Sequence, residues 1–127
     1  RAAGKNANLL LNIGPEPGGA LPSLALDRLK AIGKWLDKYG NTIYGTRGGI
    51  VAPHDWGVST QRDNKLYIHI LNCQDASLFI PLGKHQVKFA KEYATGKQIK
   101  YIKGREGVTL NLGTTPTDID YVVELTL

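Results

Sequence analysis

The chain has 127 residues, 42% of them hydrophobic and 21% charged, with a formal net charge of +5; this composition is typical of a single globular domain and excludes a disordered chain. It has no run of about 18 apolar residues that could span a membrane, and its one cysteine, Cys73, cannot form an internal disulfide. The three histidines and Cys73 show no spacing typical of zinc ligands, so we expect neither a metal nor another cofactor.

The first 46 residues predict an incomplete βα unit. Residues 8–13 form an apolar run, typical of a short strand buried on both faces, and the loop at 14–19 is rich in glycine and proline. A helix follows, with Pro22 in its first turn, apolar residues at helical spacing, and Gly40 as a left-handed stop. A lone βα unit has no sheet to lie on. Since the chain also begins with Arg1 and lacks methionine, we expect it to be a piece of a longer protein.

Beyond residue 46 the hydrophobic period becomes twofold, which predicts a second domain over 47–127 after a first over 1–46. Residues 56–60 and 66–70 alternate on either side of a turn at Asp63-Asn64 and indicate a hairpin. Turn signals about every ten residues are typical of an antiparallel β-sandwich. The further strands are predicted at 78–82, 86–93, 98–103, 108–112 and 121–127, about seven strands in all.

The net charge is concentrated in residues 84–106, which contain seven basic and two acidic residues. Phe89, Tyr93 and Tyr101 lie among the lysines, as a nucleic-acid-binding surface requires. Lysines that alternate with aromatic residues are also typical of half-buried strands whose lysines prevent edge pairing. We favour this second interpretation and expect no nucleic-acid or membrane partner.

Carboxyl groups that could carry chemistry are scattered. Glycoside hydrolysis needs two converging carboxyls, and Glu16 is alone in its loop, where we interpret it as a solvated residue. Asp118 and Asp120 would share a face of an extended chain, but a calcium site would need more oxygen ligands, so we interpret both as turn residues. The loop at 14–19 lacks the Gly-Lys-Ser/Thr ending of a phosphate-binding loop.

The sharpest candidate for a sugar contact is His54-Asp55-Trp56, because it joins an acid and a histidine to an aromatic ring suited to stacking. Neighbouring residues of an extended chain point to opposite faces, so we favour a capping loop here. His69 alternates with Ile68 and Ile70, which predicts a structural or surface histidine, and Cys73 has no basic neighbour that would activate its thiol.

Several ordered stretches resemble a known family. Residues 8–15, the helix end at 29–36 and the run at 40–46 are similar to the C-terminal end of the retaining α-L-fucosidases. Residues 56–60, 65–69 and 122–125 resemble the C-terminal β-sandwich of that family, so the resemblance covers nearly the whole chain. It departs from the family pattern at residues 16–19 and at Tyr39, and neither departure affects the fold.

The resemblance implies a (β/α)8-like barrel followed by the sandwich, with residues 1–46 as the last strand and helix of the barrel. The fold class is therefore mainly β with one N-terminal helix, an antiparallel sandwich of about seven strands preceded by a remnant βα unit. The family's catalytic aspartate and glutamate would lie upstream, so no catalytic residue is assigned here. Barrel active sites use the loops that follow the strands, which places Glu16 at the rim.

The leading functional hypothesis is the accessory end of an exo-acting α-L-fucosidase, inactive alone, with the catalytic barrel as partner and a fucosylated glycan as substrate. One alternative is a carbohydrate-binding module that uses Trp56, His54 and neighbouring aromatics, and another is a structural interaction domain. Leu9, Leu10, Leu11 and Ile13 would lose their cover in this chain and could drive self-association. The resemblance favours a bacterial periplasmic or secreted parent.

Overall fold

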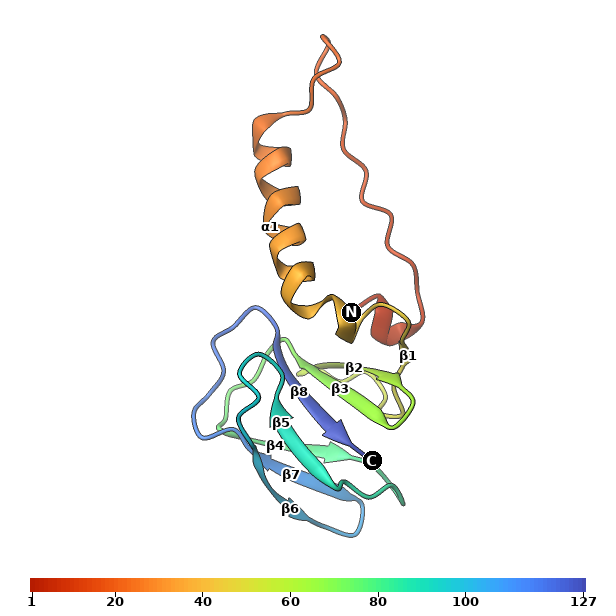
Figure 1. Ribbon diagram of the computed structural model, residues 1–127, viewed down its shortest axis with the longest axis vertical. Helices are drawn as coiled ribbons and strands as arrows, with labels where there is room; N and C mark the ends of the chain where they lie inside the picture. The colour runs from red at the N-terminus through yellow and green to blue at the C-terminus, as the bar shows by residue number, and fades with distance from the viewer.

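The computed structural model describes residues 1–127 and shows a two-layered β-sandwich from which a helical arm projects (Figure 1). All strand pairs are antiparallel, in a five-stranded sheet of order β1-β2-β3-β8-β5 and a three-stranded sheet of order β4-β7-β6. The strands are β1 Arg47–Gly48, β2 Gly57–Arg62, β3 Lys65–Ile70, β4 Ser77–Pro81, β5 Phe89–Glu92, β6 Lys100–Lys103, β7 Gly107–Asn111 and β8 Tyr121–Thr126.

The predicted fold class, mainly β with one N-terminal helix, is confirmed, and the strands predicted beyond residue 46 lie within a few residues of their expected positions. There are eight strands rather than about seven, because the two-residue β1 is too short to show an alternating pattern. Strands β5 and β6, which carry Lys91 and Lys100, each lie at the edge of a sheet, as the lysine pattern indicated. No helix is both long and apolar enough to cross a membrane.

The hydrophobic core lies between the two sheets, where Leu66, Ile68 and Ile70 of β3 meet Ile80 and Leu110 of the opposite sheet. The alternation that predicted the β2–β3 hairpin directs these side chains inward. β3 is nevertheless buried over five consecutive residues, so its other face is covered as well. On that face, Tyr67 meets the ring of Tyr93, and His69 lies against Thr60 and Asp120. The two 3-10 helices, η1 (Ala3–Lys5) and η2 (Gly40–Thr42), lie against the neighbouring β2.

Helix α1 (Ser23–Tyr39) confirms the helix predicted from the apolar spacing, and Pro22 precedes it. The prediction that Gly40 ends the helix in the left-handed conformation is wrong. Gly40 has φ −54° and continues into η2, whereas Gly45 adopts φ +67°. A Cβ at position 40 would lie 2.7 Å from Cε2 of Tyr44, so a larger residue there would displace the exposed Tyr44 ring.

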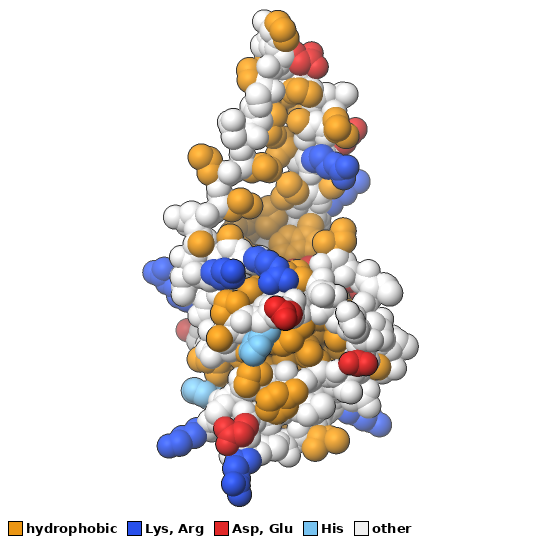
Figure 2. Space-filling model, turned by 180° about the vertical axis from the view of Figure 1, so that it is seen from behind, with side chains coloured by type: hydrophobic (Ala, Val, Ile, Leu, Met, Phe, Trp, Pro, Cys, Tyr) orange, Lys and Arg blue, Asp and Glu red, His pale blue; other side chains and the backbone are white.

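The arm, which we define as residues 7–39, consists of an extended segment, a tip loop and α1 (Figure 1). The strand predicted at residues 8–13 is absent, because a strand needs a partner for its backbone groups and this chain supplies none. Leu9 and Leu10 are 78% and 92% exposed, as expected for side chains that have lost their cover. No residue of α1 is buried. Figure 2 shows hydrophobic side chains at the surface along the whole arm.

Candidate functional site

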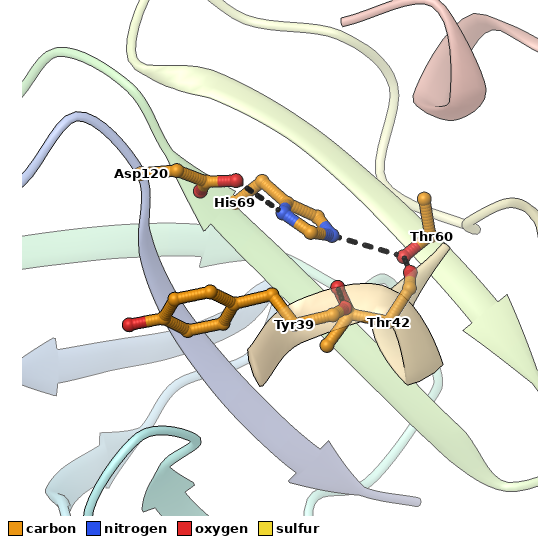
Figure 3. Close-up of polar contacts among 5 residues, drawn as sticks. All are labelled: Tyr39, Thr42, Thr60, His69 and Asp120. Carbon is orange, nitrogen blue, oxygen red and sulfur yellow. Dashed lines mark hydrogen bonds and ion pairs between the residues drawn. The ribbon is translucent and has the colours of Figure 1, made fainter. Parts of the chain in front are cut away.

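A chain of buried polar contacts fastens the base of the arm to the sandwich (Figure 3). Thr60 Oγ1 donates to the backbone carbonyl oxygen of Thr42 at 2.5 Å and lies 3.1 Å from Nε2 of His69. On the other side of the imidazole, His69 Nδ1 lies 2.9 Å from Oδ2 of Asp120. We call Thr42, Thr60, His69 and Asp120 the polar joint.

Strand register brings these residues together. Thr60 lies on β2 and His69 on the neighbouring β3, and His69 is paired with Val122 of β8. Asp120 lies two residues before Val122, so its side chain lies on the same face of the sheet as His69. Thr42, on η2, covers this face, and Thr42, Thr60 and His69 are at most 2% exposed.

Counting donors fixes the protons of the joint. The single hydroxyl proton of Thr60 is donated to the Thr42 carbonyl, so Nε2 of His69 must donate to Thr60 Oγ1. A proton must also lie between Nδ1 and the carboxylate oxygen of Asp120, because two acceptors at that distance would repel each other. The other side-chain oxygen of Asp120, Oδ1, is buried without a hydrogen-bond partner.

Four aromatic rings form a second contact between α1 and the sandwich. Trp35 and Tyr39 of α1 stack with their ring centroids 5.2 Å apart, and Tyr39 lies 5.9 Å from Tyr93. Tyr93 in turn meets the edge of the Tyr67 ring at 5.9 Å. Burial, followed by the charges of Tyr67 and Glu124, raises the pKa of Tyr93 above its ordinary value. These rings bury apolar surface at the end of the helix nearest the sheet.

The predicted sugar contact, His54 and Trp56, lies in the loop before β2. The two rings stack on each other with centroids 5.4 Å apart and an interplanar angle of 13°, and Trp56 also packs against the core. The Trp56 carbonyl accepts backbone hydrogen bonds from Leu71 and Asn72, so the loop caps the end of β3, in agreement with the capping interpretation. His54 therefore already covers one face of the Trp56 indole. A sugar contact at Trp56 stays a prediction.

Comparisons with known proteins agree on one family. The family model for α-L-fucosidase matches residues 1–41. The chain is 31% identical to a putative α-L-fucosidase of Caenorhabditis elegans over 86% of its own length and 24% of the relative's. It is 27% identical to the α-L-fucosidase of Dictyostelium discoideum, with 83% and 22% covered.

The similarity to solved structures extends over nearly the whole chain. Isoenzyme 1 of the Paenibacillus thiaminolyticus α-L-fucosidase is 34% identical, with a TM-score of 0.84 over 99% of this chain and 32% of that one. The GH29 α-L-fucosidase of Bacteroides thetaiotaomicron is 25% identical, with a TM-score of 0.88 over 98% of this chain and 29% of that one. The chain corresponds to the C-terminal part of the α-L-fucosidases. It spans about a quarter of the length of the curated relatives.

In this C-terminal part of a fucosidase, none of the main cavities is lined by two carboxyl groups. Among the main cavities, one is lined by Asp120 and another by Glu92, and the others have no acidic lining residue. Glu16 is exposed in the tip loop, in a turn that the Gly19 N–H closes by donating to the Glu16 carbonyl at 2.8 Å. The tip lies at the far end of the arm from the sandwich, so Glu16 does not meet His54 or Trp56 (Figure 1).

Sequence reasoning on this fucosidase chain missed the polar joint. It treated His69 correctly as a structural or surface histidine and placed Asp120 in a turn, but it did not bring the two together. The missing information was the pairing of β3 with β8, which places residue 120 beside residue 69. A buried histidine on one strand and an aspartate just before another would have suggested the pair once that register was known.

Proposed function

We propose that this chain is the C-terminal end of an exo-acting α-L-fucosidase. Residues 1–46 supply the last strand and helix of a catalytic (β/α)8-like barrel, and residues 47–127 form a sandwich that stabilises and flanks it. The catalytic carboxylates belong to the part of the enzyme that precedes this chain. The chain alone is inactive towards fucosides.

The observation that carries this proposal is the uncovered arm. The family model for α-L-fucosidase matches residues 1–41, which include the whole arm, and the same segment exposes its apolar side chains. The exposed side chains of the arm include Leu9, Leu10, Leu11, Leu24, Leu26, Leu29 and Ile32. Exposed leucines lie on both the extended segment and α1. They support the proposal that a neighbouring part of a barrel covers the arm in the complete enzyme.

The direction of the chain supports a place for Glu16 at the rim of the active site. The tip loop follows the extended segment and precedes α1, which is the position of the loops that build the active site of a (β/α)8 barrel. We place Glu16 at that rim as a residue that contacts substrate rather than as a catalytic acid, because it has no second carboxyl near it. Replacement Glu16→Ala should change KM for a fucosylated oligosaccharide in the complete enzyme, with Asp27→Ala on the outer side of α1 as the control.

The test of the proposed function compares two proteins with one substrate. The complete protein that contains this chain should release the aryl group from an aryl α-L-fucoside, and the 127-residue chain should not. Turnover by the chain alone would overturn the placement of the catalytic carboxylates. Absence of turnover by the complete, folded protein would overturn the assignment as a fucosidase.

The same exposed leucines support a second property of the chain alone. With the barrel absent, the arm offers a few hundred Å2 of apolar surface, which is enough to find a partner. We expect the 127-residue chain to self-associate through the arm. Sedimentation velocity over a range of concentrations would show this, and replacement of Leu10 by Ser should reduce it.

A further inference from the structure

Two loops at the end of the sandwich farthest from the arm form a pocket (Figure 1). One loop, at residues 82–88, connects β4 to β5, and the other, at residues 104–106, connects β6 to β7. The lining of this pocket of about 300 Å3 includes four residues with basic side chains, namely Lys84, His85, Lys103 and Arg105. No acidic residue is among the ten that line it. We call it the basic pocket.

Strand register brings the two loops together and holds them in place. Pro81, the last residue of β4, is paired with Gly107, the first residue of β7. Beyond this pair, the backbone N–H groups of Leu82 and Gly83 both donate to the carbonyl of Glu106, at 3.0 and 3.1 Å. The backbone around the pocket is thus fixed by the fold itself, which lowers the conformational entropy that binding costs.

The positive charges of the basic pocket are not paired within the chain. Lys84, Lys103 and Arg105 are exposed, and none of them takes part in an ion pair of residues 1–127. Glu106, the only acidic residue of the two loops, is exposed and lies outside the lining. Figure 2 shows Lys and Arg side chains projecting from this end of the sandwich. Because like charges held close together repel one another, an anionic group that binds between them is stabilised.

The lining narrows the class of anionic partner. Stacking of nucleic-acid bases requires exposed aromatic rings, and no Phe, Tyr or Trp lines the pocket. Tyr101, which lies among the lysines in the sequence, packs against the core and donates its hydroxyl to the Val87 carbonyl. Insertion into a membrane surface requires exposed apolar side chains, and the apolar side chains of the lining, Val87 and Val108, are buried. An acidic glycan needs neither feature, because charge-assisted hydrogen bonds recognise its anionic groups.

We propose that the basic pocket binds sulfate or carboxylate groups of an acidic glycan. The choice of a glycan rests on the proposed function, because a fucosidase acts on fucosylated glycan chains. The pocket lies at the opposite end of the molecule from the tip loop with Glu16, so it binds the glycan far from the proposed rim of the active site (Figure 1). It is an anchoring site for acidic chains that carry fucose, and none of its residues is catalytic.

Isothermal titration calorimetry with the complete protein that contains this chain tests the proposal. The probes are oligosaccharides of equal length from chondroitin sulfate, which carries sulfate and carboxylate groups, from hyaluronan, which carries only carboxylates, and from neutral dextran. We expect the chondroitin sulfate probe to bind, more weakly as the salt concentration rises, and the dextran probe not to bind. Binding of hyaluronan as well would show that carboxylates suffice, whereas its failure to bind would show that sulfate is the group recognised. Binding of neither acidic probe, or equal binding of dextran, would overturn the proposal.

A pair of matched double variants tests whether binding occurs at the pocket. Lys103→Gln with Arg105→Gln removes two positive charges from the pocket, and Lys97→Gln with Lys100→Gln removes two from positions outside it. All four side chains are exposed, so both variants should fold. We expect the pocket variant to bind the chondroitin sulfate probe about tenfold more weakly, since each exposed charge pair changes affinity by a few-fold. The control should stay within about twofold of the wild type, and equal losses in both variants would overturn the proposal.

An oligothymidylate with the same number of charges tests the alternative partner, a nucleic acid. We expect it to bind more weakly than the chondroitin sulfate probe, because the pocket has no aromatic ring on which bases could stack. Tighter binding of the oligothymidylate would overturn the choice of a glycan.

Hydrolysis of an aryl α-L-fucoside separates this proposal from the proposed function, because that small neutral substrate does not need the basic pocket. The pocket variant should hydrolyse it at the wild-type rate. Hydrolysis by the complete protein without binding of either acidic probe would overturn only the inference about the pocket. Pocket-dependent binding of the chondroitin sulfate probe without hydrolysis would overturn only the assignment as a fucosidase.

Discussion

The replacement Thr60→Val tests the polar joint within this chain. Valine has nearly the same shape and suits a β-strand, so the change removes the hydroxyl and little else. Two buried groups then lose their partners, namely the carbonyl of Thr42 and the Nε2 proton of His69. An unsatisfied buried polar group costs about 1–3 kcal/mol. We therefore expect the free energy of unfolding to fall by about 2–4 kcal/mol.

Urea denaturation of the 127-residue chain measures this change through the shift of the midpoint at unchanged slope. Thr60→Ser keeps the hydroxyl and loses one methyl group, so it should cost only about 1 kcal/mol. Thr115→Val makes the same replacement at an exposed site without a side-chain hydrogen bond and should leave the midpoint unchanged. A loss below about 0.5 kcal/mol for Thr60→Val would refute the hydrogen-bonded joint.

Three further predictions concern the hairpin, the tyrosine contact and the arm. A Cβ at Gly57 would overlap the carbonyl oxygen of His69, so Gly57→Ala should lower the free energy of unfolding by about 1–3 kcal/mol, as measured by urea denaturation. Gly14→Ala is the control, because a Cβ there would lie in open space and should leave the stability unchanged. Because burial raises the pKa of Tyr93 above its ordinary value of 10.0, the folded state holds this proton longer than the unfolded state. Stability should then fall as the pH rises above about 10, and Tyr93→Phe should lessen that fall; an identical fall in the variant would contradict the assignment. Since no residue of α1 is buried, its amides should exchange much faster than those of β3 in the 127-residue chain, and equal protection of the two elements would show that the arm has another source of stability.

The β2–β3 hairpin and helix α1 could be predicted from the sequence, because each has a pattern within its own residues. The β2–β3 hairpin follows from two alternating segments and the turn at Asp63, which adopts φ +52°. Helix α1 follows from apolar residues at helical spacing. In both cases the signal is local, because it records which side chains share a face of one element.

Features that depend on distant parts of the chain could not be predicted in this way. The apolar run at residues 8–13 indicates a buried strand, but burial requires neighbouring strands that this chain does not contain. Gly40 follows a helix, where glycine usually adopts a left-handed conformation, yet here it keeps a φ of −54° and continues into η2. The pairing of His69 with Asp120 depends on the register of strands that are far apart in the sequence.

The two contacts at the base of the arm contribute differently to its position. The stack of aromatic rings from Trp35 to Tyr67 buries apolar surface, and such contacts tolerate small rotations and shifts. The hydrogen bond from Thr60 to Thr42 is directional and connects the short helix after α1 to one position on β2. We infer that the rings hold the arm to the sandwich and that the polar joint sets its angle. Because the tip loop with Glu16 lies at the opposite end of the arm, a small change of that angle displaces the loop by a larger distance, so the sandwich would determine where the proposed rim of the active site lies.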